Sequence, residues 1–159
     1  MKFKDLFKFL FVFVLCQAAG AVGSLFTIPA IPGWYAHLQK PSFSPPNWIF
    51  APVWTILFTL MAIAAYQVWM KGLKDPLVRA ALVVFLAQLA LNSLWSFLFF
   101  GLRSPFYGLL EIFVLWLAIL VTILRFLRVS RTAACLMVPY LLWVSFACSL
   151  NLGIFLLNR

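Results

Sequence analysis

Long apolar runs alternate with short polar segments along this chain. Five runs are long enough to predict membrane-spanning helices, and they cover residues 6–28, 49–70, 77–100, 106–127 and 132–157. Crossing about 30 Å of hydrocarbon takes about 20 helical residues. The runs lack the polar/apolar alternation of membrane β-strands. The pattern therefore predicts one all-α domain, residues 1–159, built from five transmembrane helices.

The composition supports a membrane protein. Hydrophobic residues make up 66% of the chain and charged residues 9%, whereas a soluble domain has about 25% charged and 45–50% apolar residues. A soluble core of this size could not hide so much apolar surface from water. A lipid bilayer is therefore the expected surrounding.

The N-terminus could be mistaken for a signal peptide. Lys2, Lys4 and Lys8 precede an apolar stretch, and small residues follow at 18–21. The apolar run continues past those small residues to Ile28, whereas the apolar part of a signal peptide is shorter. We therefore expect the first helix to be retained.

The Lys and Arg residues predict the orientation. Nine lie on one side of the expected membrane, namely Lys2, Lys4, Lys8, Lys71, Lys74, Arg79, Arg125, Arg128 and Arg131. Only Lys40, Arg103 and Arg159 lie on the other. The positive-inside rule then places the N-terminus in the cytoplasm and the C-terminus outside. We expect a bacterial cytoplasmic membrane, with an outer or organellar membrane as the alternative.

The charge and the reactive residues narrow the function. The net charge of +9 lies in loops that face lipid head groups, and no basic domain is left to bind nucleic acid. Cys16, Cys135 and Cys148 fall inside expected spans without metal-ligand spacing, and the chain has one His. We therefore expect no protein-built metal site and no required cofactor. Nucleotide-binding and hydrolytic motifs lack support.

The first loop, about residues 29–48, combines prolines with aromatic residues. The segment from Pro29 to Pro52 holds six of the nine prolines, together with Trp34, Tyr35 and other rings. Proline restricts its own backbone and that of its predecessor, so the loop can form a rigid lid. An interfacial belt of Trp and Tyr is the alternative, but the length and the Pro density favour a lid.

Three helices carry polar or small residues on a face with Trp. Gln88, Asn92 and Trp95 share one face of the third helix, since they lie at i, i+4 and i+7. The second helix repeats this spacing in Trp54, Phe58, Met61 and Ala65, and the fifth in Trp143, Ala147 and Asn151. Such faces could line a flat, mostly apolar cavity for an aromatic ligand. The alternative is helix packing, in which the amides bond across helices.

The first helix also carries a stripe of small residues. Ala19, Gly20, Gly23 and Ser24 are spaced to permit the close approach of another helix. We therefore expect a homodimer, unless the fold itself uses this face.

The order and spacing of these residues resemble the translocator protein family, which includes bacterial tryptophan-rich sensory proteins and the mitochondrial peripheral benzodiazepine receptor. The resemblance covers almost the whole chain and three separate helices. It rests on Trp34-Tyr35, Leu38, Lys40-Pro41, Pro45-Pro46, Trp48, Pro52-Val53-Trp54-Thr55, residues 88–92, Trp95, residues 99–101, Pro139-Tyr140, Trp143, Ala147 and Leu150-Asn151.

The resemblance implies a ligand and a site. Members of the family bind porphyrins such as protoporphyrin IX, and some bind cholesterol and benzodiazepine-type ligands, in a pocket that the five helices enclose beneath the first loop. The matching positions are Trp34, Tyr35, Trp48, Trp54, Asn92, Trp95, Trp143 and Ala147. Trp54 and Trp143 match tryptophans implicated in light-dependent porphyrin breakdown.

Three functions remain open from the sequence. The first is porphyrin binding for sensing or transport. The second is an enzyme that degrades porphyrin with light and oxygen, with Trp54 and Trp143 as catalytic residues. The third is a dimeric regulatory scaffold. Glu111 stands where the family more often has Asp, and we expect a snorkelling or capped acid there.

Overall fold

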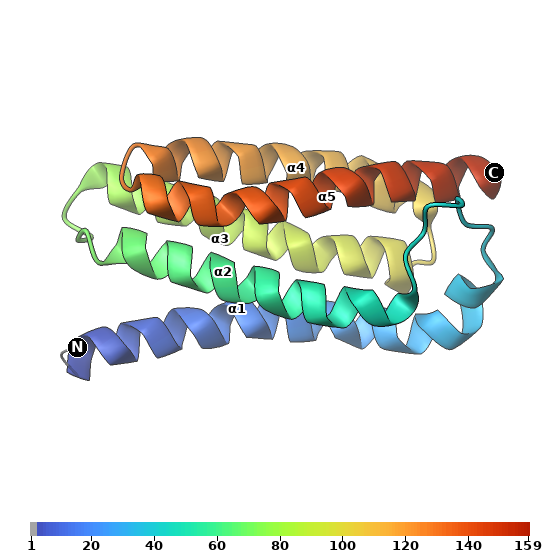
Figure 1. Cartoon of the computed structure of the whole chain (residues 1–159), viewed down its shortest axis with the longest axis horizontal. Helices are drawn as coiled ribbons and strands as arrows, with labels where there is room; N and C mark the ends of the chain where they lie inside the picture. Colours follow the sequence, from blue (N-terminus) through green and yellow to red (C-terminus); the bar gives the residue numbers. More distant parts are fainter. Residues whose placement is uncertain (1–2) are drawn as a thin grey trace.

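Five long helices run side by side along the long axis of the molecule (Figure 1). The structure is a computed structural model and describes residues 3–159, so that Lys2, used above to predict orientation, lies outside the described residues. The helices are α1 (Phe3–Ala30), α2 (Phe50–Trp69), α3 (Pro76–Ser96), α4 (Pro105–Leu127) and α5 (Arg131–Leu157). All five are long and apolar enough to cross a membrane. The prediction of an all-α bundle of five transmembrane helices is confirmed.

Side-chain caps fix where α3, α4 and α5 begin. Asp75, Ser104 and Ser130 accept hydrogen bonds from backbone N–H groups of the helices that follow, at 2.8, 3.3 and 3.3 Å. Pro76 and Pro105 then start α3 and α4, at a position where the missing N–H is not needed. These caps satisfy backbone groups that a helix end leaves free. Short connections can therefore join α2 to α3, α3 to α4 and α4 to α5.

The first helix is longer than the sequence predicts. It continues past Ile28, through Pro29 and a π-helical turn at Ile31–Tyr35. A proline inside a helix lacks an N–H and collides with the carbonyl four residues earlier, and the wider π turn accommodates this defect. The expected loop of residues 29–48 is therefore reduced to an irregular segment, residues 38–46, and a short turn at Asn47–Ile49.

Residues 38–46 form the lid, which reaches across to the end of α5 (Figure 1). The backbone N–H of Gln39 donates to Asn158 Oδ1 at 3.0 Å, and Asn158 Nδ2 donates to the Gln39 carbonyl at 2.8 Å. Pro41 lies against Gly153, where an added Cβ would stand 2.5 Å from Pro41 Cγ. The lid is therefore fastened to α5 by two hydrogen bonds and a close van der Waals contact.

The two ends of the bundle differ in composition. We call the end with the N-terminus and the α2–α3 and α4–α5 turns the basic end, and the opposite end the lid end. Small residues fill the core toward the basic end, among them Ala62, Ala64, Ala65, Val68, Val78, Ala81, Ala133 and Ala134. Aromatic rings gather at the lid end, where Trp34, Tyr35, Phe99 and Phe100 pack together.

Candidate functional site

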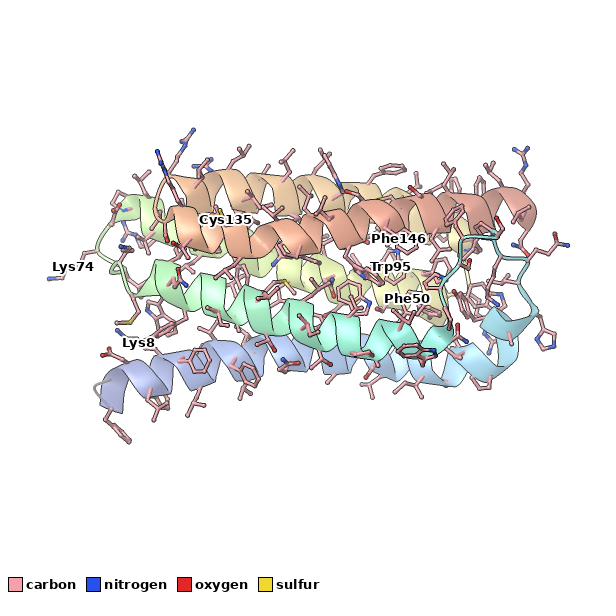
Figure 2. The ribbon with its side chains drawn as sticks, in the orientation of Figure 1. Lys8, Phe50, Lys74, Trp95, Cys135 and Phe146 are labelled. Atoms are coloured by element: carbon pink, nitrogen blue, oxygen red, sulfur yellow. The ribbon has the colours of Figure 1, made fainter. Side chains whose placement is uncertain are left out.

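A cavity of about 460 Å³ lies at the lid end. It is bounded by α1, α2, α3 and α5 together with two π-helical turns, Ile31–Tyr35 after α1 and Phe97–Gly101 after α3. Figure 2 shows Phe50 and Trp95 in this part of the bundle, far from Lys8 and Lys74 at the basic end. Helix α4 contributes no lining residue. Four helices therefore line the cavity, whereas the family resemblance implies five.

Eight aromatic side chains line the cavity, and several of them pack in pairs. Trp95 stacks on Phe99 with ring centroids 5.2 Å apart, and Trp54 lies 5.6 Å from Phe58. Trp143 meets Phe50 edge to face at 5.9 Å. All six of these residues line the cavity. Aromatic pairs hold one another in defined orientations. The wall is thus apolar and built largely of flat surfaces.

Two of the three asparagines that line the cavity, Asn92 and Asn151, also bond to neighbouring helices. Asn92 Nδ2 donates to the Tyr140 hydroxyl at 2.8 Å. Asn151 accepts from Trp95 Nε1 at 3.3 Å and donates to the Pro105 carbonyl at 2.9 Å. These bonds join α3, α4 and α5, as the packing alternative predicts, and both asparagines also line the cavity. Asn92 uses one of its two amide N–H groups in this way, so the second N–H and the carbonyl oxygen are the groups that it can offer to a ligand.

The first helix contributes a wall that the sequence analysis did not assign to the site. Gly20 and Gly23 line the cavity and let α1 approach its neighbours closely. An added Cβ would stand 2.5 Å from Phe58 at Gly20 and 2.9 Å from Ser96 Oγ at Gly23. The spacing of these small residues predicts a close helix contact, and the structure shows this contact within the chain. Because the fold itself uses Gly20 and Gly23, a homodimer would have to form through another surface.

Exposed residues of α1 and α2 border the cavity. They are Ala21 and Ile28 of α1 and Ala51 and Thr55 of α2. Thr55 donates its hydroxyl hydrogen to the Ala51 carbonyl at 2.9 Å, so its polar group is satisfied within its own helix. An apolar ligand that approached from the bilayer between these two helices would therefore meet little unsatisfied polar surface.

The structure brings most of the expected site residues together. Tyr35, Trp54, Asn92, Trp95, Trp143 and Ala147 line the cavity. Trp34 does not, because its ring packs behind the wall against Phe99 at 5.5 Å. Trp48 lies on the short turn before α2, 73% exposed, where it resembles an interfacial aromatic residue. Sequence spacing gives no helical face for residues in such irregular segments.

Glu111 lies in α4, away from the cavity lining. Its side chain is only 6% exposed, and neither carboxylate oxygen has a hydrogen-bond partner within the described residues. The expectation of a snorkelling or capped acid is therefore wrong in this structure. The helical phase explains this, because Gly108, Ile112 and Leu115 on the same face are also buried.

The three cysteines form neither a disulfide nor a metal site within the described residues. Cys16 is buried, Cys148 is half-buried and Cys135 is exposed, and all three are free thiols. Across residues 3–159, no three His, Cys, Asp or Glu side chains gather as they do around a metal ion. The chemistry available at the lid end therefore comes from aromatic rings, amides and hydroxyls.

Known proteins are similar in sequence to this chain over most of its length. The pattern of the TspO/MBR family matches residues 12–157. The chain is 49% identical to the tryptophan-rich protein TspO of Chlorobaculum tepidum, over 91% of each chain. It is 46% identical to the protein of the same name from Archaeoglobus fulgidus, over 89% of this chain and 90% of that one. It is also 38% identical to the human translocator protein, over 87% of this chain and 83% of that one.

Proposed function

The chain belongs to the TspO/MBR family, and from this premise and the geometry of the cavity we propose that it binds porphyrins such as protoporphyrin IX, for sensing or transport in the membrane. The proposal rests on the cavity at the lid end, whose wall combines Trp54, Trp95 and Trp143. The relatives' names, tryptophan-rich sensory protein and translocator protein, accord with sensing and transport.

The size and chemistry of the cavity suit a flat aromatic ligand. Its volume of about 460 Å³ lies within the range of about 300–1,000 Å³ for small-molecule sites. Burying the two faces of a porphyrin against the tryptophans supplies most of the binding free energy, at about 25 cal/mol per Å² of apolar surface. Asn92 and Asn151, which line the cavity, orient the ring. We expect micromolar affinity, about −8 kcal/mol.

Quenching of tryptophan fluorescence tests this proposal. Protoporphyrin IX should quench the emission saturably, because three of the seven tryptophans line the cavity. Trp143→Ala should weaken binding by about 1–3 kcal/mol, the range for losing a large contact side chain. Trp69→Phe is the control, since Trp69 lies at the basic end, where the Lys8 ammonium sits 6.0 Å from its ring centroid.

Comparison with the Trp69→Phe control shows which results would contradict the proposed porphyrin site. Equal losses of affinity in Trp143→Ala and Trp69→Phe would show that the porphyrin partitions into the detergent or the protein surface. Quenching that does not saturate would show the same. Either result would overturn the proposed site.

Degradation of the bound porphyrin is the second candidate function. Trp54 and Trp143 line the same cavity, and Trp54 lies 6.1 Å from the ring of Tyr140. A bound porphyrin would therefore contact both residues while light and oxygen oxidise it. Illumination of the complex in air should then produce a new absorbing product, and Trp54→Phe and Trp143→Phe should abolish it. Product formation that both variants retain would exclude these tryptophans as catalytic residues.

A further inference from the structure

We propose that the basic end holds a second binding site, which takes the phosphodiester headgroup of an anionic phospholipid. A separate cavity of about 360 Å³ lies there, between the end of α2 and the start of α5. It is lined by Tyr66, Gln67, Met70, Lys71, Ser130 and Thr132.

The lining offers hydrogen-bond donors and one positive charge. The Lys71 ammonium has three N–H donors, and the Gln67 amide has two more. Thr132 and Tyr66 each contribute a hydroxyl, and no carboxylate lines the cavity. Ser130 Oγ already accepts a hydrogen bond from the Ala133 N–H, so its own hydrogen is available to donate. A phosphodiester accepts hydrogen bonds and carries one negative charge, and therefore matches this set.

The surroundings of the cavity favour an anion over a neutral headgroup. Cationic residues of both turns and of the helix ends beside them lie at this end, including Lys8, Lys74, Arg79, Arg125, Arg128 and Arg131. The whole chain has only three carboxylates. Asp5 and Asp75 lie at the basic end, where Asp75 caps α3, and Glu111 is buried in α4. The positive charge is therefore only partly neutralised by the protein and attracts anionic lipid.

The position of the cavity favours a lipid over a soluble ion. Lys71 follows the last residues of α2, and Thr132 lies in the first turn of α5. The cavity therefore lies where these two apolar helices meet the polar turns at their ends. Met70 and the Tyr66 ring add apolar wall beside the polar groups. A phospholipid places its phosphate at this depth, with acyl chains along the apolar helices.

The site is independent of the porphyrin proposal. The two cavities share no lining residue and lie at opposite ends of the bundle, as the positions of Lys74 and Trp95 in Figure 2 indicate. A change at Lys71 should therefore leave porphyrin quenching unaltered. Quenching also serves as a check that each variant is folded.

Lipid binding to the full chain in neutral detergent tests the site. Native mass spectrometry should show one saturable dioctanoyl phosphatidylglycerol per chain, and the thermal unfolding temperature should rise with its concentration. Lys71→Gln should weaken binding about tenfold, because it replaces a charged donor to the phosphodiester by a neutral one. Lys74→Gln removes the same charge from an exposed residue of the same turn that does not line the cavity. Its effect should stay within about twofold.

Several outcomes would overturn the proposal. Equal losses in Lys71→Gln and Lys74→Gln, or no saturable binding, would show diffuse attraction to a basic surface. Dioctanoyl phosphatidylcholine that binds as tightly would remove the requirement for an anion. Inorganic phosphate that binds as tightly would indicate a site for a soluble ion. If Lys71→Gln does not fold, Thr132→Val tests the same cavity through an exposed hydroxyl, and unchanged lipid binding in that variant would reject the site.

Discussion

The basic end and the lid end are built from the same helices, yet they pack differently. Toward the basic end, alanines such as Ala62 and Ala65 let the helices meet closely, and both side chains are almost fully buried. At the lid end, Trp54, Trp95 and Trp143 surround a cavity. Both regions are strongly apolar, so hydrophobicity alone does not distinguish them. Small side chains therefore let the core of the bundle close toward the basic end, where the second cavity lies only between the ends of α2 and α5, whereas large rings leave a hollow among the helices at the lid end.

The largest expected effect concerns which end faces the cytoplasm. The sequence assigns nine Lys and Arg residues to the side of the membrane that holds the N-terminus and three to the other side, so the positive-inside rule predicts a C-terminus outside. A periplasmic reporter fused after Arg159 should be active, and a cytoplasmic reporter at the same place should be silent. The opposite pattern would reverse the assignment of the two ends.

Matched Ala→Leu substitutions should separate the two packing regimes. Ala65 is 1% exposed in the close-packed core, so Ala65→Leu should lower the free energy of unfolding by about 1–3 kcal/mol through overpacking. Ala147 borders the cavity, so Ala147→Leu should change stability by less than about 1 kcal/mol and reduce porphyrin affinity. Unfolding in mixed micelles measures the first effect and fluorescence quenching the second. Similar destabilisation by both would mean that the lid end is as tightly packed as the core.

The hydrogen bonds of Asn151 should matter to the lid end despite its cavity. Asn151→Ala removes bonds to Trp95 and to the Pro105 carbonyl. With each interhelical bond contributing about 0.6–1.7 kcal/mol in membrane proteins, we expect a loss of about 2 kcal/mol in the free energy of unfolding. Asn47→Ala is the control, because Asn47 also lines the cavity but is exposed. A loss as large in the control would attribute the effect to cavity lining rather than to the bonds.

The smallest expected effect is at the lid itself. Asn158→Ala removes both side-chain hydrogen bonds to the Gln39 backbone, which should loosen the lid by about 1 kcal/mol. Hydrogen exchange at the Gln39 amide should accelerate while global unfolding stays unchanged. Gln39→Ala is the matched control, since it keeps the backbone groups that Asn158 contacts. Faster exchange in the control as well would show that the Gln39 side chain, not Asn158, holds the lid.

The sequence predicts the helices better than the segments between them. About 20 consecutive apolar residues are a strong indication of a span because a bilayer imposes that length. The continuation of α1 through Pro29 to Tyr35 was not predictable, since prolines normally end helices and only a local π turn accommodates them here. The lid was predictable from its prolines, but its attachment to Asn158 depends on the tertiary fold.

The cavity was predictable only in part, for a related reason. Helical spacing places Asn92 and Trp95 on one face, and both line the cavity. Spacing cannot say whether a stripe such as Gly20 and Gly23 meets a helix of the same chain or of another copy, because both contacts need small residues. Nor can it place Trp48, which precedes α2 in a short turn.

The attachment of the lid to Asn158 has a consequence for kinetics. If a ligand leaves beneath the lid, the two bonds to Gln39 must break both when it enters and when it leaves. If breaking these two hydrogen bonds costs about 1 kcal/mol of free energy, association and dissociation are both slowed about fivefold, and the equilibrium constant is unchanged. A ligand that leaves sideways between α1 and α2 does not require these hydrogen bonds to break. The residence time in Asn158→Ala therefore reports the exit route, and for a ligand that passes the lid, Asn158 controls how long it stays rather than how tightly it binds.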